Sequence, residues 1–116
     1  FSSCEKLILG ERNITTGIEA INTIKTFKIE DKKLDDCWIL NGNTIKFNTP
    51  TYQFILESSE GNNFLQAYTP PKENIIAIEP TTGVSNSFNN KIGLQILEPS
   101  ESYSINWEIK IKINTN

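Results

Sequence analysis

The residues of this sequence that could do chemistry are carboxylates and one amide that border or interrupt apolar segments. Glu79 ends the apolar run of residues 75–78 and directly precedes Pro80. A carboxylate at the end of a buried strand is partly desolvated, which suits a general base or an acceptor for a ligand hydroxyl. The alternative is that Glu79 points outward and only marks the end of a strand.

Asp35 and Asp36 come just before Trp38, which places carboxylates near a large aromatic residue. Sugar-binding sites combine these types, because carboxylates accept hydrogen bonds from hydroxyls and aromatic faces cover apolar C–H groups. The alternative is a charged loop in front of a core tryptophan. Gln66 is a polar residue inside an apolar segment and could face a cleft, or it could occupy an ordinary outward position on a strand.

The composition excludes several other chemistries. The 116 residues include no histidine, so this chain alone cannot supply an imidazole acid, base or metal ligand. A net charge of −3 provides no basic field for a phosphate backbone, so no nucleic acid is expected as a partner. No apolar run is long enough to span a membrane, and the absence of a targeting segment favours the cytoplasm.

The two cysteines, Cys4 and Cys37, are too few for a disulfide scaffold or for a zinc site without other ligands. The simplest interpretation is that both are small buried apolar residues. A disulfide between them stays open for an oxidising compartment, since the sequence does not give the distance between them.

The elements that must position these residues are predicted to be β-strands. The chain has eighteen isoleucines and eleven threonines but three alanines, and β-branched residues favour strands. Short strands are expected over residues 38–40, 44–47, 52–57, 64–69, 75–79, 92–97 and 105–113. Residues 18–29 are also predicted to be extended, although a helix over 17–28 competes. This series predicts an all-β fold, an antiparallel β-sandwich.

Three local patterns make sharper predictions about these strands. Asn41-Gly42 predicts a tight hairpin turn between the strands on either side of it. Pro80 is expected to end the strand before it. Residues 105–113 alternate apolar with polar side chains, which predicts a half-buried strand with Trp107 in the core.

Taken together, five segments resemble the C-terminal part of the aldose 1-epimerase (galactose mutarotase) family. They are LDDCW (34–38), NNFLQAYTP (62–70), IIAIEP (75–80), NSFNN (86–90) and IGLQILEPSES (92–102). The stretch 13–27, with its ITTG sequence, is similar to the segment that leads into this region. The resemblance covers nearly the whole chain. Each motif is short, so the weight lies in their order and spacing.

The resemblance implies a large antiparallel β-sandwich with a sugar cleft on one sheet, of which residues 1–116 would be a single domain or the C-terminal portion. It implies interconversion of the α and β anomers of a free aldohexose such as galactose or glucose, without metal or cofactor. By position, Glu79 matches the family's general base, Asp35 an aspartate that binds sugar hydroxyls, and Gln66 a glutamine that contacts the monosaccharide. The catalytic histidine lies upstream in the family, so we expect a second chain or an N-terminal half to supply it and this chain alone to be inactive.

The sequence departs from the family pattern at three positions. Asp36 stands where many members have histidine, Trp38 where they have phenylalanine, and Ser100 where they have glycine. The changes at Asp36 and Trp38 leave room for a different hexose or a modified one. Two other interpretations stay open, a non-catalytic carbohydrate-binding β-sandwich and a structural β-domain at a protein interface. A truncated sandwich would expose unpaired sheet edges and apolar surface, and would therefore associate.

Overall fold

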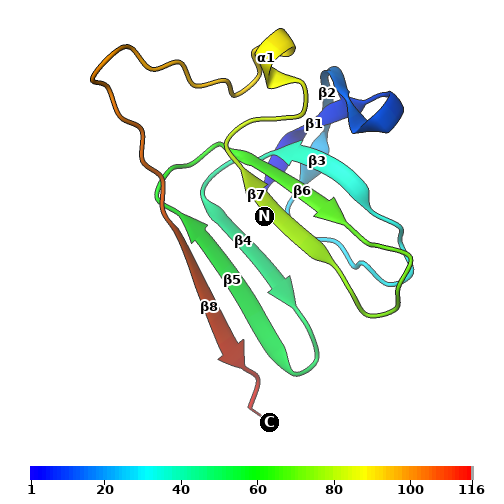
Figure 1. The fold of residues 1–116 in the computed structure, drawn as a ribbon. Helices are drawn as coiled ribbons and strands as arrows, with labels where there is room; N and C mark the ends of the chain where they lie inside the picture. The colour runs from blue at the N-terminus through cyan, green and yellow to red at the C-terminus, as the bar shows by residue number, and fades with distance from the viewer. Residues whose placement is uncertain (116) are drawn as a thin grey trace.

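The computed structural model describes residues 1–115, which form two antiparallel β-sheets (Figure 1). The elements are β1 (Ser3–Leu9), η1 (Glu11–Asn13), β2 (Thr15–Ile24), β3 (Asp35–Ile39), β4 (Thr44–Asn48), β5 (Tyr52–Ser58), β6 (Phe64–Tyr68), β7 (Ala77–Thr81), α1 (Ser87–Asn90) and β8 (Trp107–Ile113). One sheet has the strand order β2-β1-β3-β6-β7 and the other β4-β5-β8. The predicted all-β antiparallel sandwich is confirmed, and the two sheets do not close into a barrel. No helix within residues 1–115 is long and apolar enough to cross a membrane.

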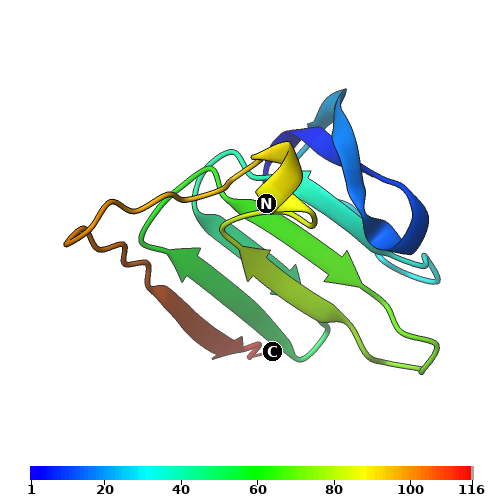
Figure 2. The ribbon, with the colours of Figure 1, turned by 45° about the horizontal axis from the view of Figure 1, so that its top comes forward.

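The main core lies between the two sheets. Its buried residues come from β3 and β6 on one side, from β4 and β5 on the other, and from the flanking connections: Leu34, Trp38, Leu40, Ile45, Leu56, Leu65 and Ala67. Removing this apolar surface from water is the main force that holds the sheets together. The long connection from α1 to β8 runs along the outside of the molecule (Figures 1 and 2) and adds none of these residues.

Strand β6 serves both the core and the opposite face of its sheet. Leu65 and Ala67 are buried in the main core. Successive side chains of a strand point to opposite faces, so Phe64, Gln66 and Tyr68 lie on the face that points away from the core. Because β6 pairs with both β3 and β7, this outer face continues across three strands.

The predicted hairpin at Asn41-Gly42 is wrong. β3 pairs with β1 and β6, whereas β4 pairs with β5, so the connection carries the chain from one sheet to the other. Its backbone groups bond to distant segments instead of across a hairpin. Asn41 N donates to Ser2 O at 2.7 Å, and Gly42 O accepts from Asn62 N at 2.9 Å. Gly42 still has the positive φ of +99° that makes glycine useful in a turn.

Pro80 does not end a strand, because β7 lies two residues later than predicted and passes through it. Asn63 O and Thr69 N, at the two ends of β6, both bond toward β3. The backbone N–H and C=O groups of the odd-numbered residues of β6 therefore point toward β3, and those of the even-numbered residues point toward β7. Pro80 is opposite Leu65, so the position that lacks an N–H faces outward from this edge strand, where proline is tolerated.

The predicted strand over residues 92–97 is also wrong, since the structure forms a turn and an irregular segment there. Gly93 takes a φ of +74°, which breaks an extended path. Ile96 is 74% exposed, so the apolar run that suggested a strand has no sheet to pack against.

Residues 107–113 form the predicted last strand, but none of its side chains is buried. Trp107, expected in the core, is 42% exposed, and that prediction is wrong. The reason is the position of β8 at the end of the three-stranded sheet.

Residues 15–24 are extended, so the strand interpretation of this region is confirmed as far as Ile24 and the helix is excluded. Strand β2 contains a bulge, because Glu5 of β1 lies opposite Ala20 while Ser3 lies opposite Ile24. Ile21 and Ile24 consequently both pack against the main core.

Candidate functional site

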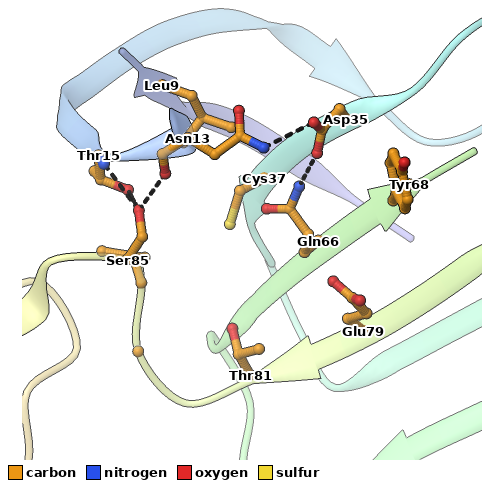
Figure 3. A pocket seen from close by; sticks show the side chains of 12 residues that line it. Leu9, Asn13, Thr15, Asp35, Cys37, Gln66, Tyr68, Glu79, Thr81 and Ser85 are labelled. Carbon is orange, nitrogen blue, oxygen red and sulfur yellow. Dashed lines mark hydrogen bonds between the residues drawn. The ribbon is translucent and has the colours of Figure 1, made fainter. Parts of the chain in front are cut away.

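An open cleft of about 430 Å³ lies on the outer face of the five-stranded sheet (Figure 3). It is lined by Leu9, Asn13, Thr15, Asp35, Cys37, Gln66, Tyr68, Glu79, Thr81, Gly83, Val84 and Ser85. This volume is within the usual range for small-molecule sites. The three site residues to which the family resemblance points, Asp35, Gln66 and Glu79, line it.

The register of three strands brings these residues together. Gln66 on β6 is directly opposite Cys37 on β3 and directly opposite Glu79 on β7. Directly opposite side chains lie on one face of a sheet, with Cβ atoms roughly 4.5–5.5 Å apart. Asp35 precedes Cys37 by two residues and therefore shares this face. Segments that are separate in the sequence thus form a single row of polar groups.

Two amide groups hold the Asp35 carboxylate in place. Gln66 Nε2 donates to Asp35 Oδ1 at 2.9 Å, and Asn13 Nδ2 donates to Asp35 Oδ2 at 2.7 Å (Figure 3). Hydrogen bonds to an ionised group are stronger than neutral ones, so the plane of the carboxylate is well defined. Each oxygen keeps a second lone pair for a ligand hydroxyl, and Gln66 Oε1 is a further acceptor.

Asn13 is a residue of the site that the sequence did not reveal. It lies in η1 with a φ of 58°, and its sequence signal is that of an ordinary turn residue. Ser85, from the loop after β7, fixes this turn from the other side of the cleft. Ser85 Oγ donates to Asn13 O at 2.6 Å and accepts from Thr15 N at 2.8 Å. Nothing in the local sequence of either segment predicts this contact.

Glu79 is the open carboxylate of the cleft. Its side chain is exposed and makes no hydrogen bond or ion pair with another of residues 1–115. The burial expected for the end of a buried strand is not observed, because Glu79 lies exposed on the edge strand β7. The unpaired carboxylate can nevertheless accept a proton or a hydrogen bond from a ligand hydroxyl.

Cys37 forms the buried floor beside Gln66. Burial, and then the negative charge of Glu79, raise the pKa of the Cys37 thiol to about 11. The thiol therefore stays protonated at neutral pH and acts as a small apolar group instead of a nucleophile. Cys4 and Cys37 are both free, so the disulfide left open by the sequence is not formed.

Asp36 and Trp38 point away from the cleft, because alternate residues of β3 face opposite sides. Trp38 is 4% exposed in the main core, and Asp36 Oδ1 lies 2.6 Å from Lys6 Nζ. The expected pairing of Asp35 with this aromatic is wrong, and the core-tryptophan alternative holds, on a strand instead of a loop. The aromatic side chain that does line the cleft is Tyr68.

Comparisons with protein-family models, with curated proteins and with solved structures found no match. Within residues 1–115, no three histidine, cysteine, aspartate or glutamate side chains are grouped so that they could hold a metal ion. The described cleft offers one carboxylate held by amides, one free carboxylate, an amide oxygen and the hydroxyls of Tyr68 and Thr81. This set of groups is chemically suited to hydrogen bonding with a small polyhydroxyl ligand.

Proposed function

We propose that the cleft binds a free aldohexose such as galactose or glucose, and that the chain supplies the general base of an aldose 1-epimerase. The observation that supports this proposal is the position of Asp35, Gln66 and Glu79. The family resemblance points to these residues from three separate segments, and all three line one cleft.

In this proposal Glu79 takes the proton from the anomeric hydroxyl while Asp35 and Gln66 hold other hydroxyls of the sugar. An acid protonates the ring oxygen, the bond from that oxygen to the anomeric carbon breaks, and a carbonyl forms. Rotation of the carbonyl and closure on its other face return both protons and give the other anomer. Paired acid and base catalysis contributes typically 10²–10⁴-fold to the rate.

In the family the acid is a histidine, and this sequence contains none. The proposal takes it from a second chain or from an N-terminal portion of a larger mutarotase-like sandwich. Residues 1–116 alone would then bind the sugar without accelerating its interconversion. We also place the reaction in the cytoplasm, and the free Cys4 and Cys37 agree with a reducing compartment.

A second candidate function is a carbohydrate-binding module without catalysis. The observation that favours it is that Glu79 is exposed and has no imidazole in this chain to work with. Both candidates predict sugar binding in the cleft. They differ in whether Glu79 takes part in proton transfer.

Sugar binding is tested by an NMR titration of the chain with galactose and with glucose. We expect the Asp35→Asn variant to bind at least about tenfold more weakly, because it loses charge-assisted hydrogen bonds to hydroxyls. Asp36→Asn is the matched control, since it makes the same change on the opposite face of the strand. Equal affinities of the two variants would remove Asp35 from the sugar site.

Catalysis is tested by adding imidazole as a replacement for the absent histidine side chain. Polarimetry measures the interconversion rate with the chain alone, imidazole alone and both together. The epimerase proposal expects a combined rate above the sum, and expects Glu79→Gln but not Glu101→Gln to abolish the excess. Sugar binding with no excess rate would leave the binding-module candidate.

A further inference from the structure

The outer edge of β8 presents a row of free backbone groups. Ser59 N donates to Asn106 O at 2.8 Å, and Asn114 N donates to Thr51 O at 2.9 Å. The backbone N–H and C=O groups of the even-numbered residues of β8 therefore point toward β5. The N–H and C=O groups of the odd-numbered residues face away from the sheet: Trp107, Ile109, Ile111 and Ile113. β8 is the last strand of the three-stranded sheet, with β5 on its other side (Figure 1).

The same four residues carry an uncovered apolar row. Ile109 is opposite Leu56, so both side chains lie on the face that packs against the main core. Leu56 is 4% exposed, whereas Ile109, Ile111 and Ile113 are 59%, 62% and 71% exposed. On the inner face of the three-stranded sheet, the apolar side chains of β8 therefore lie beyond the area that the five-stranded sheet covers. A free edge next to an apolar row is the usual setting for strand pairing between chains.

The edge at β7 differs from the edge at β8 in one respect. At β7, Pro80 occupies an outward-facing position and removes a donor that a further strand would need. Residues 107–113 contain no proline, so every outward position of β8 keeps its donor. Of these two edges, β8 is the one open to a continuous ladder.

We propose that β8 pairs antiparallel with β8 of a second copy of this chain, across a two-fold axis at Ile109. Trp107 then lies opposite Ile111 of the second copy, and Glu108 lies opposite Lys110 of the second copy. The outward backbone groups of both strands meet, and the two three-stranded sheets become one continuous six-stranded sheet. The apolar rows join on one face, and the charged residues face each other on the opposite face.

The charge pattern selects this register among those that keep the two faces matched. An axis at Lys110 would place two copies of Lys110 opposite each other. An axis at Ile111 would place Lys110 opposite Lys112 twice, and like charges directly opposite are destabilising. The axis at Ile109 gives two glutamate–lysine pairs and sets Lys112 opposite Asn106. Within one chain, Glu108 Oε1 lies 3.9 Å from Lys110 Nζ on an exposed strand. Both side chains are therefore available to the second copy.

The proposal does not rest on sugar binding, and its test is the oligomeric state. Analytical ultracentrifugation over concentrations up to about 0.1 mM should show a species of twice the 13.1 kDa chain mass. Glu108→Lys and Lys110→Glu should each weaken association by about tenfold, because each creates two like-charge pairs. The variant that combines both substitutions should restore association, since each exchanged charge again faces the opposite charge on the second copy.

Two further variants separate this register from other modes of association. Lys112→Glu makes the same charge change opposite Asn106 and should leave association unchanged. Ile111→Pro removes an outward N–H without touching the bonds to β5, so it should weaken association while circular dichroism and thermal unfolding confirm that the chain is folded.

Three results would overturn the proposal. A chain that remains monomeric over the whole range has no such pairing, and irregular larger assemblies would show that β8 does not form a closed two-fold contact. A combined variant that associates more weakly than either single variant would contradict the axis at Ile109.

Discussion

Asp35 and Asp36 are neighbours in the sequence, yet they belong to different parts of the molecule. Strand alternation places Asp35 in the cleft, held by two amides, and Asp36 on the inner face beside Lys6. The sequence alone presents both as similar carboxylates before an aromatic residue. Which of the two reaches the cleft depends on the pairing of β3 with β6, and that pairing is a long-range contact.

At the same scale, the reactivity of Cys37 is a prediction about its protonation. Burial and the nearby charge of Glu79 raise the pKa of the thiol to about 11, from its usual 9.0. In a Cys4→Ala background, alkylation of the folded protein by iodoacetamide should therefore stay slow through pH 9 and rise toward about pH 11. Glu79→Gln should move this rise to lower pH, and mass spectrometry measures the rate.

The same shift makes stability depend on pH. The folded state keeps the Cys37 proton to higher pH than the unfolded state does, so its contribution is fully present below pH 9.0 and is lost as the pH rises toward about 11. A Cys37→Ala variant should not show this loss. A fast alkylation at pH 8 with no effect of Glu79→Gln would contradict the buried, charge-coupled thiol.

Gly93 is a residue whose replacement should lower the free energy of unfolding, because its surroundings leave no room for a side chain. A Cβ there would lie 2.6 Å from Phe64 Cε2 and 2.7 Å from Gly83 Cα, at a φ of +74°. Gly93→Ala should therefore lower the free energy of unfolding by at least about 2 kcal/mol, from clash and backbone strain together. Urea denaturation measures the change.

Gly42→Ala is the matched control for this clash, because Gly42 also has a positive φ but no atom within 4 Å of the added Cβ. Its cost should be limited to backbone strain of about 1–2 kcal/mol. If both variants are destabilised equally, the close packing at Gly93 contributes nothing.

At the scale of elements, the loop after β7 is tied to the turn before β2 by Ser85. Ser85→Ala removes its bonds to Asn13 O and to the N–H of Thr15, and should lower the free energy of unfolding by about 1 kcal/mol. Because Asn13 holds Asp35, the variant should also weaken the sugar binding that we propose for the cleft. Hydrogen exchange at Thr15 and an NMR titration measure the two effects.

Ser87→Ala is the control, since the Ser87 side chain makes no hydrogen bond within the described residues. It should change stability by less than about 0.5 kcal/mol. Unchanged exchange at Thr15 in the Ser85 variant would show that the loop is held by its other contacts.

Local pattern predicted several strands well. Residues 52–57, 64–69 and 105–113 combine β-branched and aromatic residues with bordering turns, and β5, β6 and β8 lie there. Two of the wrong predictions, the hairpin at residues 41–42 and the strand at residues 92–97, concern which segments pair. Pairing depends on hydrogen bonds between distant segments, such as Asn41 to Ser2, and local residue patterns carry no information about them.

The residues of the candidate site divide in the same way, into those that sequence motifs predict and those that depend on contacts between distant segments. Asp35, Gln66 and Glu79 came from ordered motifs, and the structure places them on neighbouring strands. Asn13 and Ser85 could not be predicted, because Asn13 acts through a contact with Asp35, 22 residues away, and Ser85 through a contact with Asn13, 72 residues away. Polar residues in turns are common, and their partners are set by the fold of the whole chain.

At the scale of the whole molecule, the connection before β8 is held by few contacts. Residues 95–102 are exposed, and one backbone bond, from Glu101 N to Glu98 O, lies within them. Limited digestion with a glutamate-specific protease should therefore cut first at Glu98 or Glu101. Native mass spectrometry should find the C-terminal fragment still bound, because seven residue pairs join β8 to β5.

Glutamates within strands, such as Glu57 and Glu79, serve as internal controls and should be cut late. A first cut at Glu30 or Glu73 would show that another connection is the weakest part of the fold. Loss of the C-terminal fragment after cutting would show that β8 is held by its covalent connection more than by its ladder.

The alternation along β6 also affects how this protein can change over generations. Positions 64, 66 and 68 meet the cleft face, whereas positions 65 and 67 meet the interior. Point mutations at 66, and at 35 and 79 beside it, can therefore change the surface of the cleft while the interior is inherited unchanged. An insertion or deletion of one codon within β6 would exchange the two sets and disrupt both the cleft and the interior in a single event. Lineages of this chain should consequently vary by substitution in β6 and never by length.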